Sequence, residues 1–173
     1  MPVENPDFRS TWIIGYGNPH RKDDGIGSYV VERLSADLGE GPGIFLRSLH
    51  QLDPVLAEEL QGVEVLILVD ATVEPLEQGL RWTRVRPKQD LSVRDTHHLR
   101  PEGLAGLLES LYQCYPAVWL VSVQGNDFSF GEGLSLDAQE KAQRASSEIA
   151  AFCRRESIDK RQGSINDGAG GSS

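Results

Sequence analysis

The sequence is poor in cysteine and has no apolar run long enough to cross a membrane. Only two cysteines, Cys114 and Cys153, occur among its 173 residues. Their spacing fits neither a disulfide framework nor a C-x-x-C motif, so we interpret both as buried thiols. No apolar run approaches the roughly 18 residues of a membrane helix, and the first ten residues do not resemble a secretory signal. We therefore expect a cytoplasmic protein that is not inserted in a membrane.

Basic residues are also scarce. The chain has 17 Lys and Arg against 26 Asp and Glu, which gives a net charge of -9. Such a balance repels phosphate backbones, so we expect no nucleic-acid partner. Apolar residues make up 39% and charged residues 25%, as in globular proteins. We assign residues 1–158 to a single α/β domain and the polar, glycine-rich residues 159–173 to a flexible tail.

Strand-like and helix-like segments alternate along the chain. Apolar or alternating patterns predict strands at residues 12–14, 44–49, 63–69, 80–85 and 117–123. Helical periodicity begins near Asp23, Asp53, Pro101 and Ser135. This order predicts a three-layer α/β sandwich with a mostly parallel, twisted sheet and helices on both faces. The more polar segment 80–85 is expected at an edge, where an antiparallel orientation is allowed.

The first predicted strand runs into a glycine-rich turn with two adjacent carboxylates. Residues 12–27 have the sequence W-I-I-G-Y-G-N-P-H-R-K-D-D-G-I-G. Asp23 can cap the following helix, which leaves Asp24 without a structural purpose. Either the turn is a polar helix start with glycines for packing, or Asp24 faces a ligand crevice beyond the strand ends. A dinucleotide-binding loop fits worse, because His20 occupies the position of the third glycine.

Two further segments carry candidate ligands. Asp70 follows the most apolar strand, V-E-V-L-I-L-V, and either begins a turn or shares the crevice with Asp24. His97 and His98 lie in a polar loop, where they are either solvated or functional. Together Asp24, Asp70 and His97 would supply two carboxylates and an imidazole, a donor set that suits nickel, zinc or a similar divalent ion with positions left open.

The pattern G-Y-G-N-P-x-x-x-D-D-G-I-G resembles the opening signature of the hydrogenase maturation endopeptidases, which remove the C-terminal extension of a nickel-loaded hydrogenase large-subunit precursor. The family's metal-contacting residues match Asp24 in D-D-G, Asp70 in L-V-D-A-T and His97 in D-T-H-H-L. A shift of one residue would place His98 there instead. The segment F-G-E-G-L-S, residues 130–135, is similar to members that serve bidirectional, NAD-linked hydrogenases.

This resemblance implies an endopeptidase whose metal belongs to its substrate. Nickel already placed in the NiFe-hydrogenase precursor would accept Asp24, Asp70 and His97 as ligands, and these residues would also be catalytic. Either the metal polarises the scissile carbonyl or a water, or one aspartate acts as general base. The resemblance implies no organic cofactor, and the sequence has no G-x-S-x-G nucleophile motif.

Two alternatives belong to other classes of protein. Peptidyl-tRNA hydrolases also open with a strand and G-x-G-N-P, but their next segment, T-R-H-N-x-G, is replaced here by R-K-D-D-G-I-G. The acidic charge also disfavours tRNA. The other alternative is a non-catalytic module that binds the precursor and inspects its nickel loading without cutting it.

Overall fold

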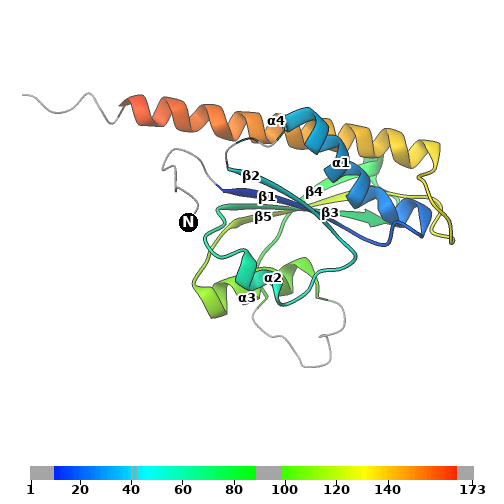
Figure 1. Cartoon of the computed structure of the whole chain (residues 1–173), viewed down its shortest axis with the longest axis horizontal. Coiled ribbons are helices and arrows are strands. Elements are labelled where there is room, and N and C mark those ends of the chain that lie inside the picture. The colour runs from blue at the N-terminus through cyan, green and yellow to red at the C-terminus, as the bar shows by residue number, and fades with distance from the viewer. Residues whose placement is uncertain (1–9, 40, 42, 89–98, 167–173) are drawn as a thin grey trace, which may run out of the picture.

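The computed structural model describes residues 10–39, 41, 43–88 and 99–166. A sheet forms the middle of three layers, with helices on either side (Figure 1). In chain order the elements are β1 (Thr11–Tyr16), the 3₁₀ helix η1 (Lys22–Gly25), α1 (Ile26–Leu38), β2 (Ile44–Leu49), α2 (Leu56–Glu59), β3 (Val65–Thr72), the 3₁₀ helix η2 (Glu77–Gly79), β4 (Leu80–Arg84), α3 (Pro101–Tyr112), β5 (Ala117–Gln124) and α4 (Leu136–Asn166).

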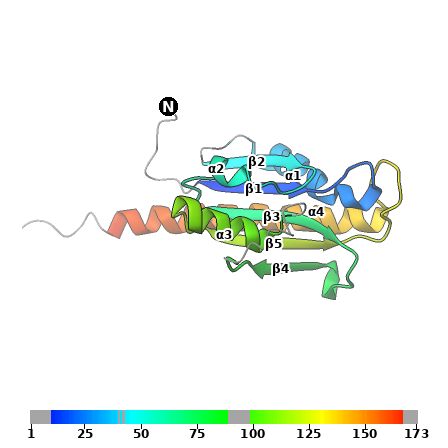
Figure 2. The same ribbon diagram turned by 90° about the horizontal axis from the view of Figure 1, so that it is seen from below.

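The sheet has the strand order β2-β1-β3-β5-β4, which Figure 2 shows strand by strand. The first four strands in this order pair in parallel, and β4 pairs with β5 in the antiparallel direction. The predicted α/β class, the mostly parallel sheet and the antiparallel edge strand are confirmed. β4 suits an edge because Arg81, Thr83 and Arg84 are exposed there.

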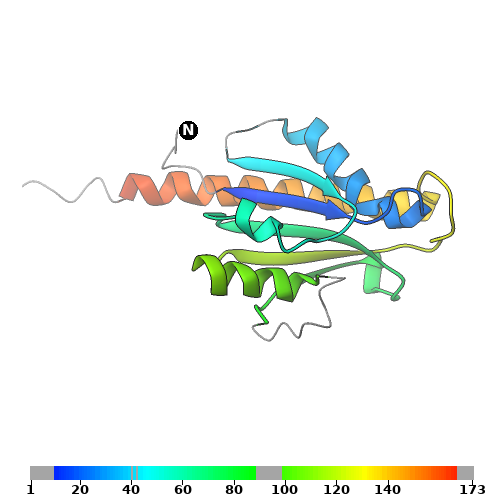
Figure 3. The same cartoon turned by 60° about the horizontal axis from the view of Figure 1, so that its bottom comes forward.

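Helices cover both faces of the sheet and enclose two apolar cores. Helices α1 and α4 pack on one face, and α2 and α3 on the other (Figure 3). β3 contributes to both cores: Val65, Ile67 and Val69 face α1 and α4, whereas Leu66 and Leu68 face α2 and α3. Each such buried side chain contributes about 1.5–3 kcal/mol to folding. The continuous apolar run of β3 therefore reflects burial on both faces, as the sequence predicts.

The order in which the chain adds strands reverses at β1. The chain first forms β2 on one side of β1 and later forms β3 on the other side of β1. Pairing between β1 and β3 ends at Gly15 and Val69, but β3 continues along β5 as far as Thr72. The carboxyl ends of β1 and β3 therefore separate at the switch point, where α/β sheets of this type bind ligands.

Two predicted boundaries are corrected at this end. Asp70 lies inside β3 rather than after it, because its pairing with Ser122 extends the strand. Asp23 does not cap α1: η1 precedes that helix, and Gly25 occupies the cap position without a side-chain bond. The Asp23 carboxylate is instead taken up by the loop between β5 and α4.

Helix α4 is longer than the sequence predicts. It begins after Ser135, whose hydroxyl accepts the Ala138 N–H as a cap at 3.3 Å, and continues to Asn166, past the boundary at residue 158. The segment after Phe152 includes Arg154, Arg155, Glu156, Lys160 and Arg161, residue types with a favourable intrinsic helix propensity. Figure 1 shows this last part of α4 extending past the amino ends of the strands. Residues 167–173 of the predicted tail lie outside the described residues.

Both cysteines are free thiols, but only Cys153 is buried, whereas Cys114 is half-buried. The Cys114 thiol lies 3.6 Å from the Val63 carbonyl oxygen, which accepts its weak hydrogen bond. None of the helices within the described residues is both long enough and apolar enough to pass through a bilayer.

Candidate functional site

Asp24 is held at the carboxyl end of β1 by the turn that leads into α1. It lies in η1, directly before Gly25 and the first turn of α1. Its carboxylate accepts the Asn18 backbone N–H at 2.7 Å, and its own N–H donates to the Arg21 carbonyl at 3.0 Å. The side chain is half-buried, so one carboxylate oxygen has a fixed donor while the group stays in reach of a ligand.

Glycines bring this turn against the ends of β1 and β3. Gly17 has a φ of +139°, and a Cβ there would lie 2.1 Å from the Asp24 carbonyl oxygen. A Cβ on Gly27 would lie 2.6 Å from the Tyr16 nitrogen and 2.9 Å from the Val69 oxygen. Since real Cβ atoms do not approach so closely, only glycine allows α1 to begin this near the strands. The glycine spacing in the signature therefore determines where Asp24 lies.

Asp70 reaches the same edge from β3. The Tyr16 hydroxyl, at the end of β1, donates a hydrogen bond to the Asp70 carboxylate. Burial raises the pKa of Asp70 to about 6; the Tyr16 hydrogen bond lowers it and the negative charge of Asp24 raises it. Burial and the charge of Asp70 also raise the pKa of Tyr16, so the phenol keeps its proton and remains a donor. Asp24 and Asp70 thus lie close enough for their charges to interact.

The third predicted ligand lies outside the described residues. His97 and the alternative His98 belong to residues 89–98. Among the side chains that the structure does describe, no group of three His, Cys, Asp or Glu residues could hold a metal ion. Two of the three predicted site residues are therefore placed together, and the position of the histidine stays a prediction.

The donor chemistry of the placed pair fits a divalent cation. Two half-buried carboxylates whose charges repel each other are stabilised when a cation neutralises them. Oxygen donors joined by one imidazole nitrogen suit first-row divalent metals, nickel among them. A pair alone leaves most coordination positions open, as a site that shares an ion with a substrate requires.

Sequence reasoning missed two residues that shape this site. Tyr16 shares a strand face with Trp12 and Ile14, and the alternation of β1 gave no sign that its hydroxyl meets Asp70. Asp23 was assigned to a helix cap, but it is fully buried and accepts hydrogen bonds from residues more than 100 positions away. The only signal in the sequence was that two adjacent carboxylates, Asp23 and Asp24, are more than one helix cap requires.

Comparison with known proteins supports this fold at the structural level. No protein-family model matches the sequence, and a search of curated proteins also gave no match. Among solved structures, HycI, a NiFe hydrogenase maturation protease from Thermococcus kodakarensis, is 23% identical with a TM-score of 0.66, over 83% of this chain and 92% of that one. The fold is that of the hydrogenase maturation proteases.

Two further structures of this kind agree. The hydrogenase-maturating endopeptidase HybD from Escherichia coli is 19% identical with a TM-score of 0.60, over 84% of this chain and 93% of that one. A hydrogenase 2 maturation peptidase from a Thaumarchaeota archaeon is 20% identical with a TM-score of 0.62, over 83% of this chain and 97% of that one. Each likeness spans nearly the whole solved chain, so the similarity concerns a complete domain.

Proposed function

We propose that this protein is a hydrogenase maturation endopeptidase, which removes the C-terminal extension of a nickel-loaded NiFe-hydrogenase large-subunit precursor. The observation that carries the proposal is the convergence of Asp24 and Asp70 at the β1–β3 switch point. The fold likeness to HycI and HybD, over 83% and 84% of this chain, supports the same reaction class.

In this proposal the nickel ion arrives with the substrate and completes the site. Asp24, Asp70 and His97 are its ligands, and no organic cofactor takes part. Support for the histidine comes from its neighbours: the described chain resumes at Leu99, which packs on the α2–α3 core, and Glu102 in the first turn of α3 lies near enough to Tyr16 to raise its pKa. Bound nickel would polarise the scissile carbonyl or a water.

The electrostatics make Asp70 a candidate for proton transfer. A general base works best when its pKa lies near the working pH, and burial raises the pKa of Asp70 to about 6. The Tyr16 hydroxyl fixes the orientation of that carboxylate by its hydrogen bond. In the alternative general-base route, in which Asp70 does not hold the metal, Asp70 is the base and Asp24, held by the Asn18 N–H, is the positioned ligand.

The test is the mass of a candidate precursor incubated with this protein. We expect loss of a C-terminal peptide with the wild-type chain and strong loss of activity with Asp24→Ala, Asp70→Ala or His97→Ala. Asp37→Ala, on the exposed face of α1, is the matched control and should cut normally. Full activity of either site aspartate variant would contradict the site. Nickel-dependent binding without cleavage would instead identify the non-catalytic module.

The partner and the compartment follow from the same proposal. The partner is the large-subunit precursor, and both proteins meet in the cytoplasm. The sequence of residues 130–135 favours a precursor of the bidirectional, NAD-linked type. This preference is tested by incubating the protein with several precursors in parallel. We expect it to cleave the precursor of the NAD-linked hydrogenase fastest.

A further inference from the structure

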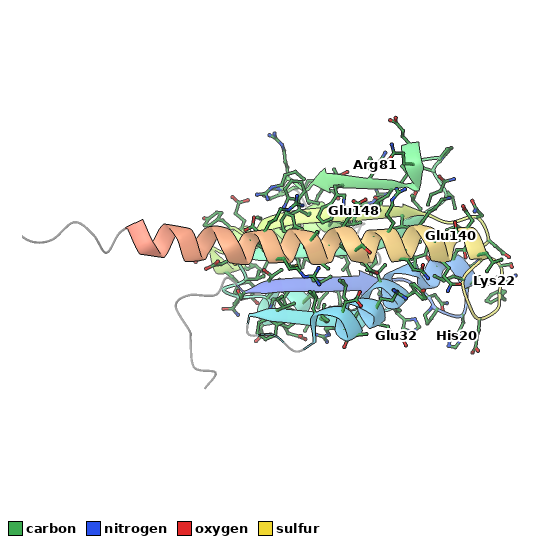
Figure 4. All side chains as sticks on the ribbon, turned by 90° about the horizontal axis from the view of Figure 1, so that it is seen from above. His20, Lys22, Glu32, Arg81, Glu140 and Glu148 are labelled. Carbon is green, nitrogen blue, oxygen red and sulfur yellow. The ribbon has the colours of Figure 1, made fainter. Side chains whose placement is uncertain are left out.

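The loop between β5 and α4 is paired with the segment directly before Asp24. The Lys22 N–H donates to the Gly131 oxygen at 3.0 Å, and the Gly131 N–H donates to the His20 oxygen at 2.9 Å. The Asp23 N–H donates to the Asp127 oxygen at 2.9 Å. Figure 4 shows His20 and Lys22 at the end of the molecule where this loop lies. Residues 126–136, which we call the rim, are therefore held against residues 20–23, directly before Asp24.

Buried polar bonds hold the rim in one conformation. The Asp23 carboxylate is fully buried and accepts the N–H groups of Asn126 at 2.8 Å, Asp127 at 2.9 Å and Ser135 at 2.7 Å. Burial alone would raise the pKa of Asp23, but these donors outweigh it and hold that pKa below its ordinary value. The Lys22 ammonium adds an ion pair with Asp127 at 2.7 Å. A loop held this way loses little conformational entropy when a partner binds.

The rim exposes apolar side chains that the fold does not use. Phe130 is 82% exposed and Leu136 is 81% exposed, whereas Leu134 between them packs against the α1–α4 core. The Arg21 guanidinium lies over the Phe130 ring, 5.2 Å from its centroid. Polar bonds already hold the loop, and the exposed Phe130 side chain buries little apolar surface. Phe130 therefore contributes little to the stability of the fold. Aromatic and arginine side chains on rigid supports are typical of protein interfaces.

We propose that the rim is a preformed docking surface for the folded body of the precursor, with Phe130 and Arg21 as its main contacts. This inference rests on the proposed function, because nickel inside a folded subunit reaches Asp24 only if that subunit approaches this end of the sheet. The guanidinium of Arg21 donates to the Phe128 oxygen at 3.3 Å and has no carboxylate partner among the described residues. The matching surface is therefore an apolar pocket for Phe130 flanked by a carboxylate for Arg21.

The chain offers a matched control at the opposite end of the sheet. Tyr115 is 70% exposed and precedes β5, far along the strand from the rim that follows it. Phe130→Ala and Tyr115→Ala each remove one exposed ring without opening a core. Both variants should therefore keep the melting temperature of the wild-type protein, which makes a difference in kinetics attributable to docking.

The experiment measures KM and kcat for cleavage of the nickel-loaded precursor, and the Kd of each variant for it. We expect Phe130→Ala to raise KM and Kd about tenfold with kcat unchanged, since a docking contact formed equally in the bound and transition states affects binding alone. Arg21→Gln should raise KM several-fold, and added salt should shrink that difference. Tyr115→Ala should match the wild type.

Three outcomes would overturn the inference. Equal KM values for Phe130→Ala and Tyr115→Ala would reject the rim while leaving the proposed function in place. A loss of kcat with unchanged Kd in Phe130→Ala would assign the ring to the chemistry rather than to docking. Wild-type protein that neither binds nor cuts any precursor would reject the proposed function and the rim with it.

Discussion

Asp23 and Asp24 are adjacent in the chain, yet their carboxylates have opposite environments. Asp23 is fully buried and satisfied by three backbone N–H groups and the Ser135 hydroxyl, at 2.8 Å. Asp24 has one backbone donor and lies close enough to Asp70 for their charges to interact. The first carboxylate stabilises the fold as an anion, whereas the second is the one that the proposed function uses as a ligand. The tandem D-D motif thus places one carboxylate in the interior and the other beside Asp70.

Asp70 should reduce the stability of the protein at neutral pH. Its pKa is about 6 in the fold against an ordinary 3.8, so between these values the folded state binds the proton more tightly than the unfolded state. Stability therefore falls as pH rises from about 4 to about 6, by at most about 3 kcal/mol at 1.36 kcal/mol per pKa unit. Asp70→Asn removes this loss while keeping an acceptor for Tyr16.

We expect Asp70→Asn to raise the free energy of unfolding by about 2 kcal/mol at pH 7 and to leave it unchanged near pH 4. Urea titrations at both pH values measure this difference. A variant that is equally stable or less stable than the wild type at pH 7 would show that Asp70 carries no electrostatic penalty in the fold.

At the scale of elements, the fold could largely be predicted from the sequence because its signals are local. The apolar run of β3 and the Pro101 start of α3 each depend on neighbouring residues alone. The rim could not be predicted in this way, because Asp23 meets Ser135 across 112 positions. The crevice was predicted in part: the ends of β1 and β3 were expected to meet, but the Tyr16–Asp70 bond depends on their register.

The junction of α1 with β1 and β3 depends on Gly27. Alanine there would place its Cβ 2.6 Å from the Tyr16 nitrogen, so the helix must move away from the strands. We expect Gly27→Ala to cost about 3 kcal/mol or more in stability. Gly41→Ala is the control, since nothing lies within 4 Å of its Cβ position, and it should change stability by less than about 0.5 kcal/mol. Equal melting temperatures for the two variants would contradict the close packing.

The last turns of α4 should be dispensable. The most C-terminal buried side chain that the structure describes is Cys153, at 4% exposed. Removal of residues 160–173 should therefore cost less than about 1 kcal/mol, which lowers Tm by about 2–4 °C at most for a chain of this size. Differential scanning calorimetry of the truncated protein measures this. A fall of 10 °C or more would show that this segment docks on the domain.

At the scale of the whole molecule, topology explains why two carboxylates meet at one edge of the sheet. The chain reverses its direction across the sheet between β1 and β3. Tyr16, the last residue of β1, bonds to Asp70 near the end of β3, and Asp24 lies close enough to Asp70 for their charges to interact. The net charge of -9 adds to the attraction of this edge for a cation. In the proposed function, a protease completed by an ion inside its substrate would be inactive toward proteins that lack that ion.

The most direct test compares nickel-loaded and metal-free forms of one precursor under the same conditions. Intact-mass spectrometry over time follows the loss of the C-terminal peptide from each form. The account predicts cleavage of the nickel-loaded precursor and none of the metal-free form, with Asp24→Ala inactive on both. Equal cleavage rates for the two forms would contradict it.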